Sequence, residues 1–205
     1  MYNNAGNRNQ TGKQKSSFQR YFEGYSEVRS VNPDGSVRVD MVYTAPYWVH
    51  DLSDKQWKLQ KYRFLGLTGL ILVLYLCAAF MPLGGEYSKF IMLPGGITAA
   101  ILVFLVTYTC TYLFCPRKMT IYDYNRNHAA MRRWPFAAAI GLTAAGIMSL
   151  VYIFVSKGDQ LLKTVIAAAC YFAAAMVAFV IYRTEDKTEY FEEENENGYA
   201  AYSSY

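Results

Sequence analysis

Four long runs of the chain carry no charged side chain, and these runs constrain the fold more than any other feature. They cover residues 64–83, 90–115, 135–156 and 164–182, which are 20, 26, 22 and 19 residues long. A helix of about 20 apolar residues crosses the hydrocarbon core of a bilayer, which is roughly 30 Å thick. We therefore expect an all-α membrane protein with four transmembrane helices in two hairpins, within a transmembrane domain covering residues 51–183.

A soluble helical bundle is the alternative. Its helices would present a polar face at every turn, whereas these runs have none. The chain is 53% hydrophobic, 17% aromatic and only 18% charged, which is too apolar for an average soluble domain. The membrane interpretation is therefore favoured.

Lys and Arg residues are distributed unevenly around the four runs. Residues 1–63 hold ten, the central loop 116–134 holds five and the tail from residue 183 holds two, whereas loops 82–89 and 157–163 hold three together. Positive charge marks the cytoplasmic side. We therefore expect a multi-pass protein of the cell (plasma) membrane with both termini and the central loop cytoplasmic. The first run would act as an uncleaved signal anchor.

Basic and aromatic residues flank the apolar runs, at the depth where amphipathic rings and snorkelling cations meet headgroups. The expected partner is a bilayer with anionic headgroups. Nucleic acid is not expected, because the chain has no Gly-and-aromatic RNA signature and no dense Lys/Arg helix. The residues predicted for this lipid interface are Trp57, Lys58, Lys61, Tyr62, Arg63, Arg117, Lys118, Arg132, Arg133 and Trp134.

The segment before the first run divides into two parts. Residues 1–16 are rich in Asn, Gln, Gly and Ser, a composition that predicts a disordered tail. Residues 17–50 form a cytoplasmic β-hairpin region, because alternating runs flank the turn sequence NPDG at 32–35. A turn there pairs Val31 with Val37 and Tyr25 with Tyr43. A two-stranded hairpin is marginal alone, so we expect the run MTIYDY at 119–124 to pair with it.

The first helix is expected to begin near residue 51. Asp51 or Ser53 can cap the free amides of its first turn. The helix then continues without a break into the first apolar run.

Small residues recur at four-residue spacing inside the last three runs, which allows helix backbones to approach closely. Packing within one four-helix bundle explains these stripes. The alternative is that they pack against another copy of the chain in an oligomer. The residues concerned are Gly95, Gly96, Ala99, Ala100, Ala137, Gly141, Ala145, Cys170, Ala174 and Ala178.

The four cysteines offer no metal spacing, because no CxxC pair or neighbouring His accompanies them. They are read as small residues at helix interfaces. A Cys77–Cys170 disulfide and palmitoylation of Cys115 are the alternatives left open. No catalytic, cofactor-binding or metal-binding residue is predicted, and no enzyme motif is found.

Hydroxyl side chains are concentrated in the inner half of the second run, at Thr107, Tyr108, Thr109, Thr111 and Tyr112. They would line a polar path in a channel or transporter subunit. The favoured alternative is that the hydroxyls bond back to carbonyl oxygens four residues earlier.

The segment 184–205 is predicted to be an acidic, Tyr-rich, mobile C-terminal tail. Residues 183–205 contain seven acids against Arg183 and Lys187. Aromatic residues are unusual in such a segment. Its tyrosines are therefore candidate docking residues for a partner: Tyr190, Tyr199, Tyr202 and Tyr205.

Most of the unusual sequence is expected on the cytoplasmic side and is suited to contact. We therefore expect a non-catalytic scaffold or accessory subunit of a membrane complex, with a protein partner or self-association. The alternative is a channel or transporter subunit that works as an oligomer.

Overall fold

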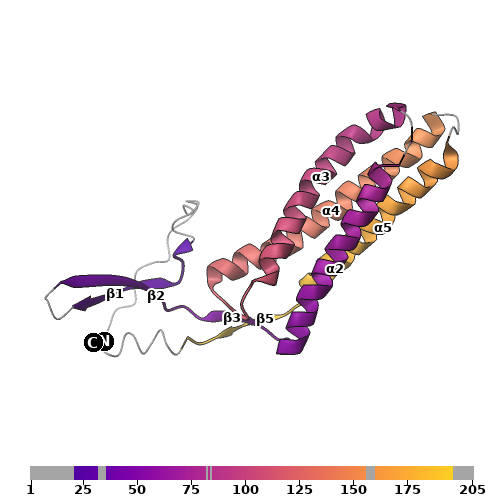
Figure 1. Cartoon of the computed structure of the whole chain (residues 1–205). Helices are drawn as coiled ribbons and strands as arrows, with labels where there is room; N and C mark the ends of the chain where they lie inside the picture. Colours follow the sequence, from indigo (N-terminus) through magenta and orange to yellow (C-terminus); the bar gives the residue numbers. More distant parts are fainter. Residues whose placement is uncertain (1–20, 32–35, 82, 84, 156–159, 196–205) are drawn as a thin grey trace, which may run out of the picture.

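The computed structural model describes residues 21–31, 36–81, 83, 85–155 and 160–195. It forms an elongated bundle of helices with short strands gathered at one end, which we call the sheet end (Figure 1). The elements in chain order are β1 (Tyr25–Val31), β2 (Val37–Tyr43), β3 (Tyr47–His50), α2 (Asp54–Ala79), α3 (Gly85–Leu113), β4 (Lys118–Met119), α4 (Ile121–Val155), α5 (Leu161–Asp186) and β5 (Tyr190–Glu193).

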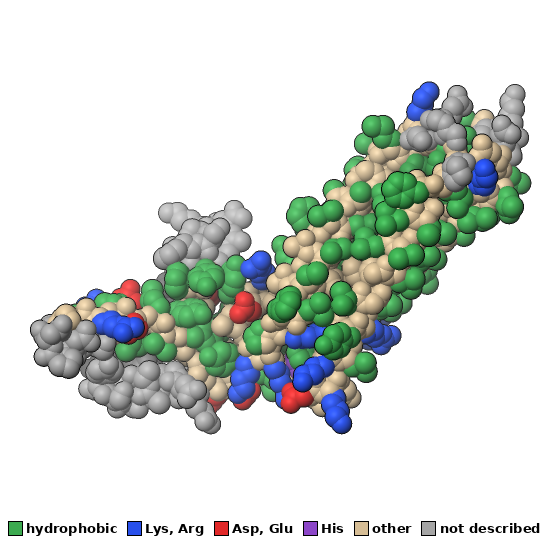
Figure 2. Space-filling model, in the orientation of Figure 1, with side chains coloured by type: hydrophobic (Ala, Val, Ile, Leu, Met, Phe, Trp, Pro, Cys, Tyr) green, Lys and Arg blue, Asp and Glu red, His purple; other side chains and the backbone are tan. Residues whose placement is uncertain are grey.

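The structure is mostly helical, and four of its helices are long and apolar enough to cross a membrane, as predicted. Helix α4 packs against both α3 and α5, and α2 packs mainly against α5. The core between them combines small and aromatic side chains, with Ala138, Ala145, Ala174 and Tyr171 fully buried. Apolar side chains also cover the outside of the bundle (Figure 2).

Helix α2 begins where the sequence predicts. The Ser53 hydroxyl accepts a hydrogen bond from the backbone N–H of Gln56, and the Gln56 side chain accepts one from the backbone N–H of Ser53. This capping box satisfies two amides that the helix leaves unpaired. The helix then continues without a break to Ala79.

The hairpin has the predicted register. Val31 pairs with Val37 and Tyr25 with Tyr43 in antiparallel strands. Its turn at 32–35 and the tail predicted at 1–16 lie outside the described residues. The hairpin extends away from the helices, as the violet ribbon in Figure 1 shows.

The predicted pairing of residues 119–124 with this hairpin is wrong. Only Lys118 and Met119 form a strand there, and they pair with β3. The Thr120 hydroxyl accepts a hydrogen bond from the backbone N–H of Asp123 and donates one to its carboxylate. This helix-start signal outweighs the strand propensity of the β-branched and aromatic run. Most of the predicted loop 116–134 is therefore the first part of α4, and Pro135 lies inside that helix.

The boundary of the predicted tail is also corrected. Helix α5 continues to Asp186, and residues 190–193 form β5, which pairs antiparallel with β3. Strand β3 thus lies between β4 and β5 in a three-stranded sheet. The aromatic pair at 190–191 has cross-strand partners to pack against, so it forms a strand despite the surrounding charge.

Candidate functional site

At the sheet end, all four helices and the three-stranded sheet meet around one carboxylate. The Glu185 side chain is fully buried. Tyr190 donates a hydrogen bond to its Oε1 over 2.8 Å, and His128 Nδ1 lies 3.0 Å from the same oxygen. Tyr112 and Gln60 donate to Oε2 over 3.0 and 3.5 Å. These residues, which we call the Glu185 cluster, join α2, α3, α4, α5 and β5.

Removing a carboxylate from water is costly unless hydrogen bonds and an opposite charge replace its hydration. The Glu185 cluster supplies hydrogen-bond partners to both oxygens. Burial, reinforced by the nearby Glu185 charge, raises the pKa of Tyr190. Its hydroxyl therefore keeps its proton and remains a donor at neutral pH.

A column of aromatic rings positions His128. The indole of Trp48 stacks on Tyr124 with ring centroids 4.3 Å apart and planes 8° apart. Tyr124 in turn stacks on the His128 imidazole at 5.2 Å and 7°. Because Trp48 belongs to β3, the column connects the sheet to the Glu185 cluster.

A second histidine, His50, is fully buried. Neither of its ring nitrogens has a hydrogen bond of good geometry among the described residues. Its ring lies 3.9 Å from the Trp57 ring, centroid to centroid. Burial, with a contribution from the Arg117 charge, lowers the pKa of His50. The neutral imidazole is the form that this site favours.

The predicted interface residues of α2 separate into two groups. Trp57 lies inside the protein, 4% exposed, and Lys61 is half-buried with its Nζ 5.0 Å from the centre of the Trp57 ring. Lys61 donates to the carbonyl oxygens of Leu113 and Cys115. The remaining three are exposed: Lys58, Tyr62 and Arg63.

The predicted basic residues of the central segment are largely paired with acids. Arg132 lies 2.7 Å from Asp186, whereas Lys118 lies 2.6 Å from Glu193 and Arg117 contacts Asp54. Exposed pairs of this kind contribute at most about 1 kcal/mol each. Two of them connect the segment 186–193 to α4 and β4, and the pairing of β5 with β3 holds this part of the predicted tail in place.

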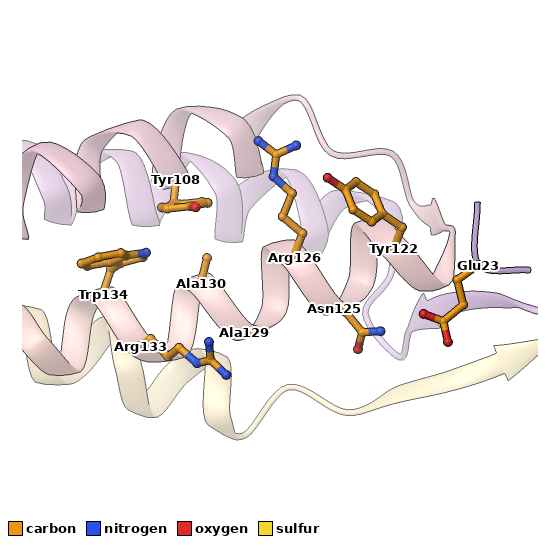
Figure 3. Close-up of a pocket in the computed structure, with 9 residues that line it drawn as sticks. All are labelled: Glu23, Tyr108, Tyr122, Asn125, Arg126, Ala129, Ala130, Arg133 and Trp134. Carbon is orange, nitrogen blue, oxygen red and sulfur yellow. The ribbon is translucent and has the colours of Figure 1, made fainter. Parts of the chain in front are cut away.

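Arg126 and Arg133 form no ion pair with a described carboxylate. They line a hollow of about 420 Å³ between α3 and α4, which we call the α4 cleft. In Figure 3, Trp134 and Tyr108 mark one end, Tyr122 and Glu23 mark the other, and Arg126 and Arg133 lie on opposite sides. Trp134 stacks on Phe104 with centroids 4.5 Å apart.

The candidate docking tyrosines of the tail are not equivalent. The Tyr190 hydroxyl is engaged by Glu185, so Tyr190 is part of the core of the sheet end. Tyr199, Tyr202 and Tyr205 lie outside the described residues.

The small residues predicted to pack between helices differ in exposure. Gly95, Ala145, Ala174 and Ala178 are buried, whereas Gly96 and Ala100 are exposed. Ala99, Ala137, Gly141 and Cys170 are half-buried.

Two of the five hydroxyls named from the sequence, those of Thr107 and Thr111, bond back to carbonyl oxygens four residues earlier, as favoured there. Thr107 donates to the carbonyl of Val103, and Thr111 donates to that of Thr107. Thr109 pairs with the Thr68 hydroxyl across the α2–α3 contact, at 3.2 Å.

All four cysteines are free. Cys115 is buried, and its Sγ accepts a hydrogen bond from Asn127 at 3.2 Å. Burial raises the pKa of the Cys115 thiol to about 11. Since the thiolate is the reactive form, this environment disfavours the acylation left open from the sequence.

The hairpin presents a separate surface. On one face of β2, Val37, Val39 and Met41 are 61%, 52% and 45% exposed. Glu27 and Arg29 on β1 lie beside Met41 and Val39. We call these five residues the arm face.

Tyr43 fixes the base of the β1–β2 hairpin, which we call the arm. Its hydroxyl donates to the carbonyl of Pro46 at 2.8 Å and accepts a hydrogen bond from the backbone N–H of Ile121 at 3.0 Å. The Asn195 side chain donates to the Tyr43 carbonyl at 2.6 Å. The base is therefore connected to the start of α4 and to the segment after β5.

Glu185 and His50 were missed from the sequence, for different reasons. Glu185 was grouped with the acidic tail, although it continues the buried stripe of α5 through Ala174, Ala178 and Ile181 at helical spacing. That periodicity is the signal that identifies it. His50 precedes the start of α2 and gives no such signal, because its burial depends on the pairing of β3 with β5.

Among the described residues, no group of three or more His, Cys, Asp or Glu side chains is placed to hold a metal ion. Comparisons with protein-family models, curated proteins and solved structures found no match.

Proposed function

We propose that this chain is a non-catalytic, multi-pass membrane protein that recruits or accompanies a protein partner through the arm face. It acts as a scaffold or accessory subunit of a membrane complex. Four apolar helices support the membrane part of this proposal. The excess of Lys and Arg in residues 1–63 and 116–134 supports a cytoplasmic sheet end. In a plasma membrane, the arm would then face the cytoplasm.

The exposure of the arm face is the main observation that supports the proposal. Three apolar side chains of one strand are about half exposed or more, beside Glu27 and Arg29 of the neighbouring strand. An exposed apolar strip bordered by charges is typical of a surface that binds another protein.

The construction of the base also supports recruitment. Gly24 at the start of β1 has φ +87°, and a Cβ there would lie 2.8 Å from both Ala45 Cβ and the Tyr43 ring. Ser26 and Thr44 pair their hydroxyls at 2.8 Å, and Tyr43 holds the start of α4. An arm anchored in this way presents its face at a defined position, which lowers the entropic cost of binding.

Affinity purification of the full chain in mild detergent tests the proposal. We expect a heterologous protein to co-purify with wild type, and to be lost when Val37, Val39 and Met41 are all replaced by Ser. The control replaces Arg38 and Asp40, whose ion pair lies on the other face of β2, by Ser. A partner retained by the triple variant would refute recruitment through the arm face. A symmetric homo-oligomer that conducts ions in liposomes would instead support the channel alternative.

A further inference from the structure

Two hollows lie between α3 and α4, one after the other along the helix axes. The first is the α4 cleft. The second is an apolar groove of about 520 Å³ that includes Ile97 and Ile101 of α3 and Ala137, Gly141 and Ala144 of α4. We call it the α3–α4 groove.

Helical spacing shows that the two hollows share a face of α4. Positions 126, 130, 133, 137, 141 and 144 follow one another by three or four residues, which places them on a single stripe. On α3, positions 97, 101, 104 and 108 do the same. The stacked rings of Phe104 and Trp134 therefore lie where one hollow gives way to the other.

The α4 cleft has the chemistry of a phosphate site. Arg126 and Arg133 flank it without a described carboxylate partner, and the guanidinium group binds phosphate oxygens through paired, charge-assisted hydrogen bonds. The tyrosines and Trp134 add rings of the kind found at headgroup depth. Glu23 lies at the far end of the hollow from Trp134, beyond the space between the two arginines.

The α3–α4 groove has the chemistry and length of an acyl-chain site. Its lining is almost wholly apolar, and the Thr98 hydroxyl within it is bonded to the Pro94 carbonyl at 2.7 Å. Positions 137 to 148 of α4 rise about 16 Å along the helix axis. One leaflet of hydrocarbon is about 15 Å thick.

We propose that the α4 cleft and the α3–α4 groove together bind one anionic glycerophospholipid. Its phosphate lies in the cleft that Arg126 and Arg133 flank, and their guanidinium groups, which point apart in Figure 3, would turn toward it. One acyl chain lies along the groove. The inference rests on the part of the proposed function that inserts α3 and α4 in a bilayer. It does not depend on the arm face.

Native mass spectrometry of the full chain, released from detergent with added dioleoyl phosphatidylglycerol or dioleoyl phosphatidylcholine, tests the site. We expect wild type to retain one phosphatidylglycerol in preference to phosphatidylcholine. Replacing Arg126 and Arg133 by Gln should lower the retained fraction about tenfold, because two charge-assisted contacts are lost. Lys55→Gln with Lys187→Gln, two exposed positions outside the predicted lipid interface, makes the same charge change and should have no effect.

The acyl chain is tested separately from the phosphate. Ala144→Phe fills the groove without touching either arginine and should also reduce retention. Ala173→Phe, an exposed position of α5, is its control. If inorganic phosphate displaces the lipid and Ala144→Phe has no effect, the cleft is a site for free phosphate and the lipid proposal is refuted. Unchanged retention in the double arginine variant, or equal retention of phosphatidylcholine by wild type, would also overturn it.

These outcomes are distinct from failure of the proposed function. The lipid experiment changes only the cleft and the groove, and the partner experiment changes only the arm face. If the chain retains the lipid but no protein partner co-purifies with it, recruitment through the arm face is refuted and the lipid site is not. Unchanged elution of each variant on size-exclusion chromatography separates loss of the site from loss of the fold.

Discussion

Nδ1 of His128 lies 3.0 Å from Oε1 of Glu185, inside a junction to which every helix of the bundle contributes. The carboxylate is fully buried and the imidazole is 17% exposed. The contact joins α4 to α5 where the helices meet the sheet, and the Trp48–Tyr124 stack holds the imidazole from the other side. One acidic side chain thus contacts residues of the other three helices and of the sheet.

Replacing Glu185 by Ala should lower the free energy of unfolding by about 3 kcal/mol or more, because buried donors from three helices and β5 lose their acceptor. Glu185→Gln keeps the shape and part of the bonding, so its effect should be smaller. Thermal or denaturant unfolding in detergent measures both. Glu189→Ala, at an exposed position four residues later, is the control. Equal stability of Glu185→Ala and Glu189→Ala would contradict the role assigned to the cluster.

The stability of wild type should depend on His50 in mildly acidic solution. Burial lowers the pKa of His50 in the folded protein, so the unfolded chain takes up the proton first as pH falls below about 6.5. The contribution of His50 to stability should therefore be constant above that pH and decrease below it. His50→Phe should remove this part of the dependence while keeping a ring against Trp57. The chain has only one other histidine, so unfolding curves of the two proteins at several pH values isolate the effect. Parallel pH profiles would count against a neutral, buried His50.

Replacement of two helical glycines by Ala should have different effects on the stability of the protein. A Cβ on Gly141 would lie 2.7 Å from the Thr98 hydroxyl, and rotation of that side chain would bring its methyl group into the same space. Gly141→Ala should therefore destabilise the protein by about 1–3 kcal/mol. A Cβ on Gly69 meets nothing within 4 Å, so Gly69→Ala should be neutral, or stabilising by up to about 1 kcal/mol. Thermal unfolding of both variants decides this, and the reverse order would show that α3 and α4 do not pack as described.

Cysteine labelling in intact cells tests the orientation. In a background without native cysteines, Lys89→Cys and Lys187→Cys place one thiol at each end of the bundle, at exposed positions. We expect an impermeant reagent to label Lys89→Cys directly and Lys187→Cys only after permeabilisation. The opposite pattern would place the sheet end outside the cell and reverse the topology.

The features predicted correctly from sequence are those fixed by local rules. The register between Val31 and Val37 follows from a turn at 32–35, and the start of α2 follows from the side chain of Ser53. Charge-free runs identified the four helices because residue type alone determines whether a helix can cross a bilayer. None of these inferences requires knowledge of distant contacts.

The features missed depend on contacts between distant segments. Strand β5 forms because β3, some 140 residues earlier in the chain, offers an edge to pair with. Residues 121–124 resemble a strand in composition, but Thr120 and Asp123 begin a helix there. Glu185 resembles its acidic neighbours until its place on the buried stripe of α5 is counted. The α4 cleft likewise exists only once Tyr108 and Trp134, from different helices, are adjacent.

The position of β3 between β4 and β5 also has a consequence for synthesis. Its two neighbours come from between the second and third helices of the bundle and from after the fourth, so the last strand leaves the ribosome after every helix has been made. Until then one edge of β3 has no partner strand, and His50 is not yet buried by β5. Other chains and chaperones bind unpaired strand edges of this kind. Completion of this sheet therefore marks a chain whose final helix is in place, and a chain truncated before residue 190 should be degraded faster than the full-length protein.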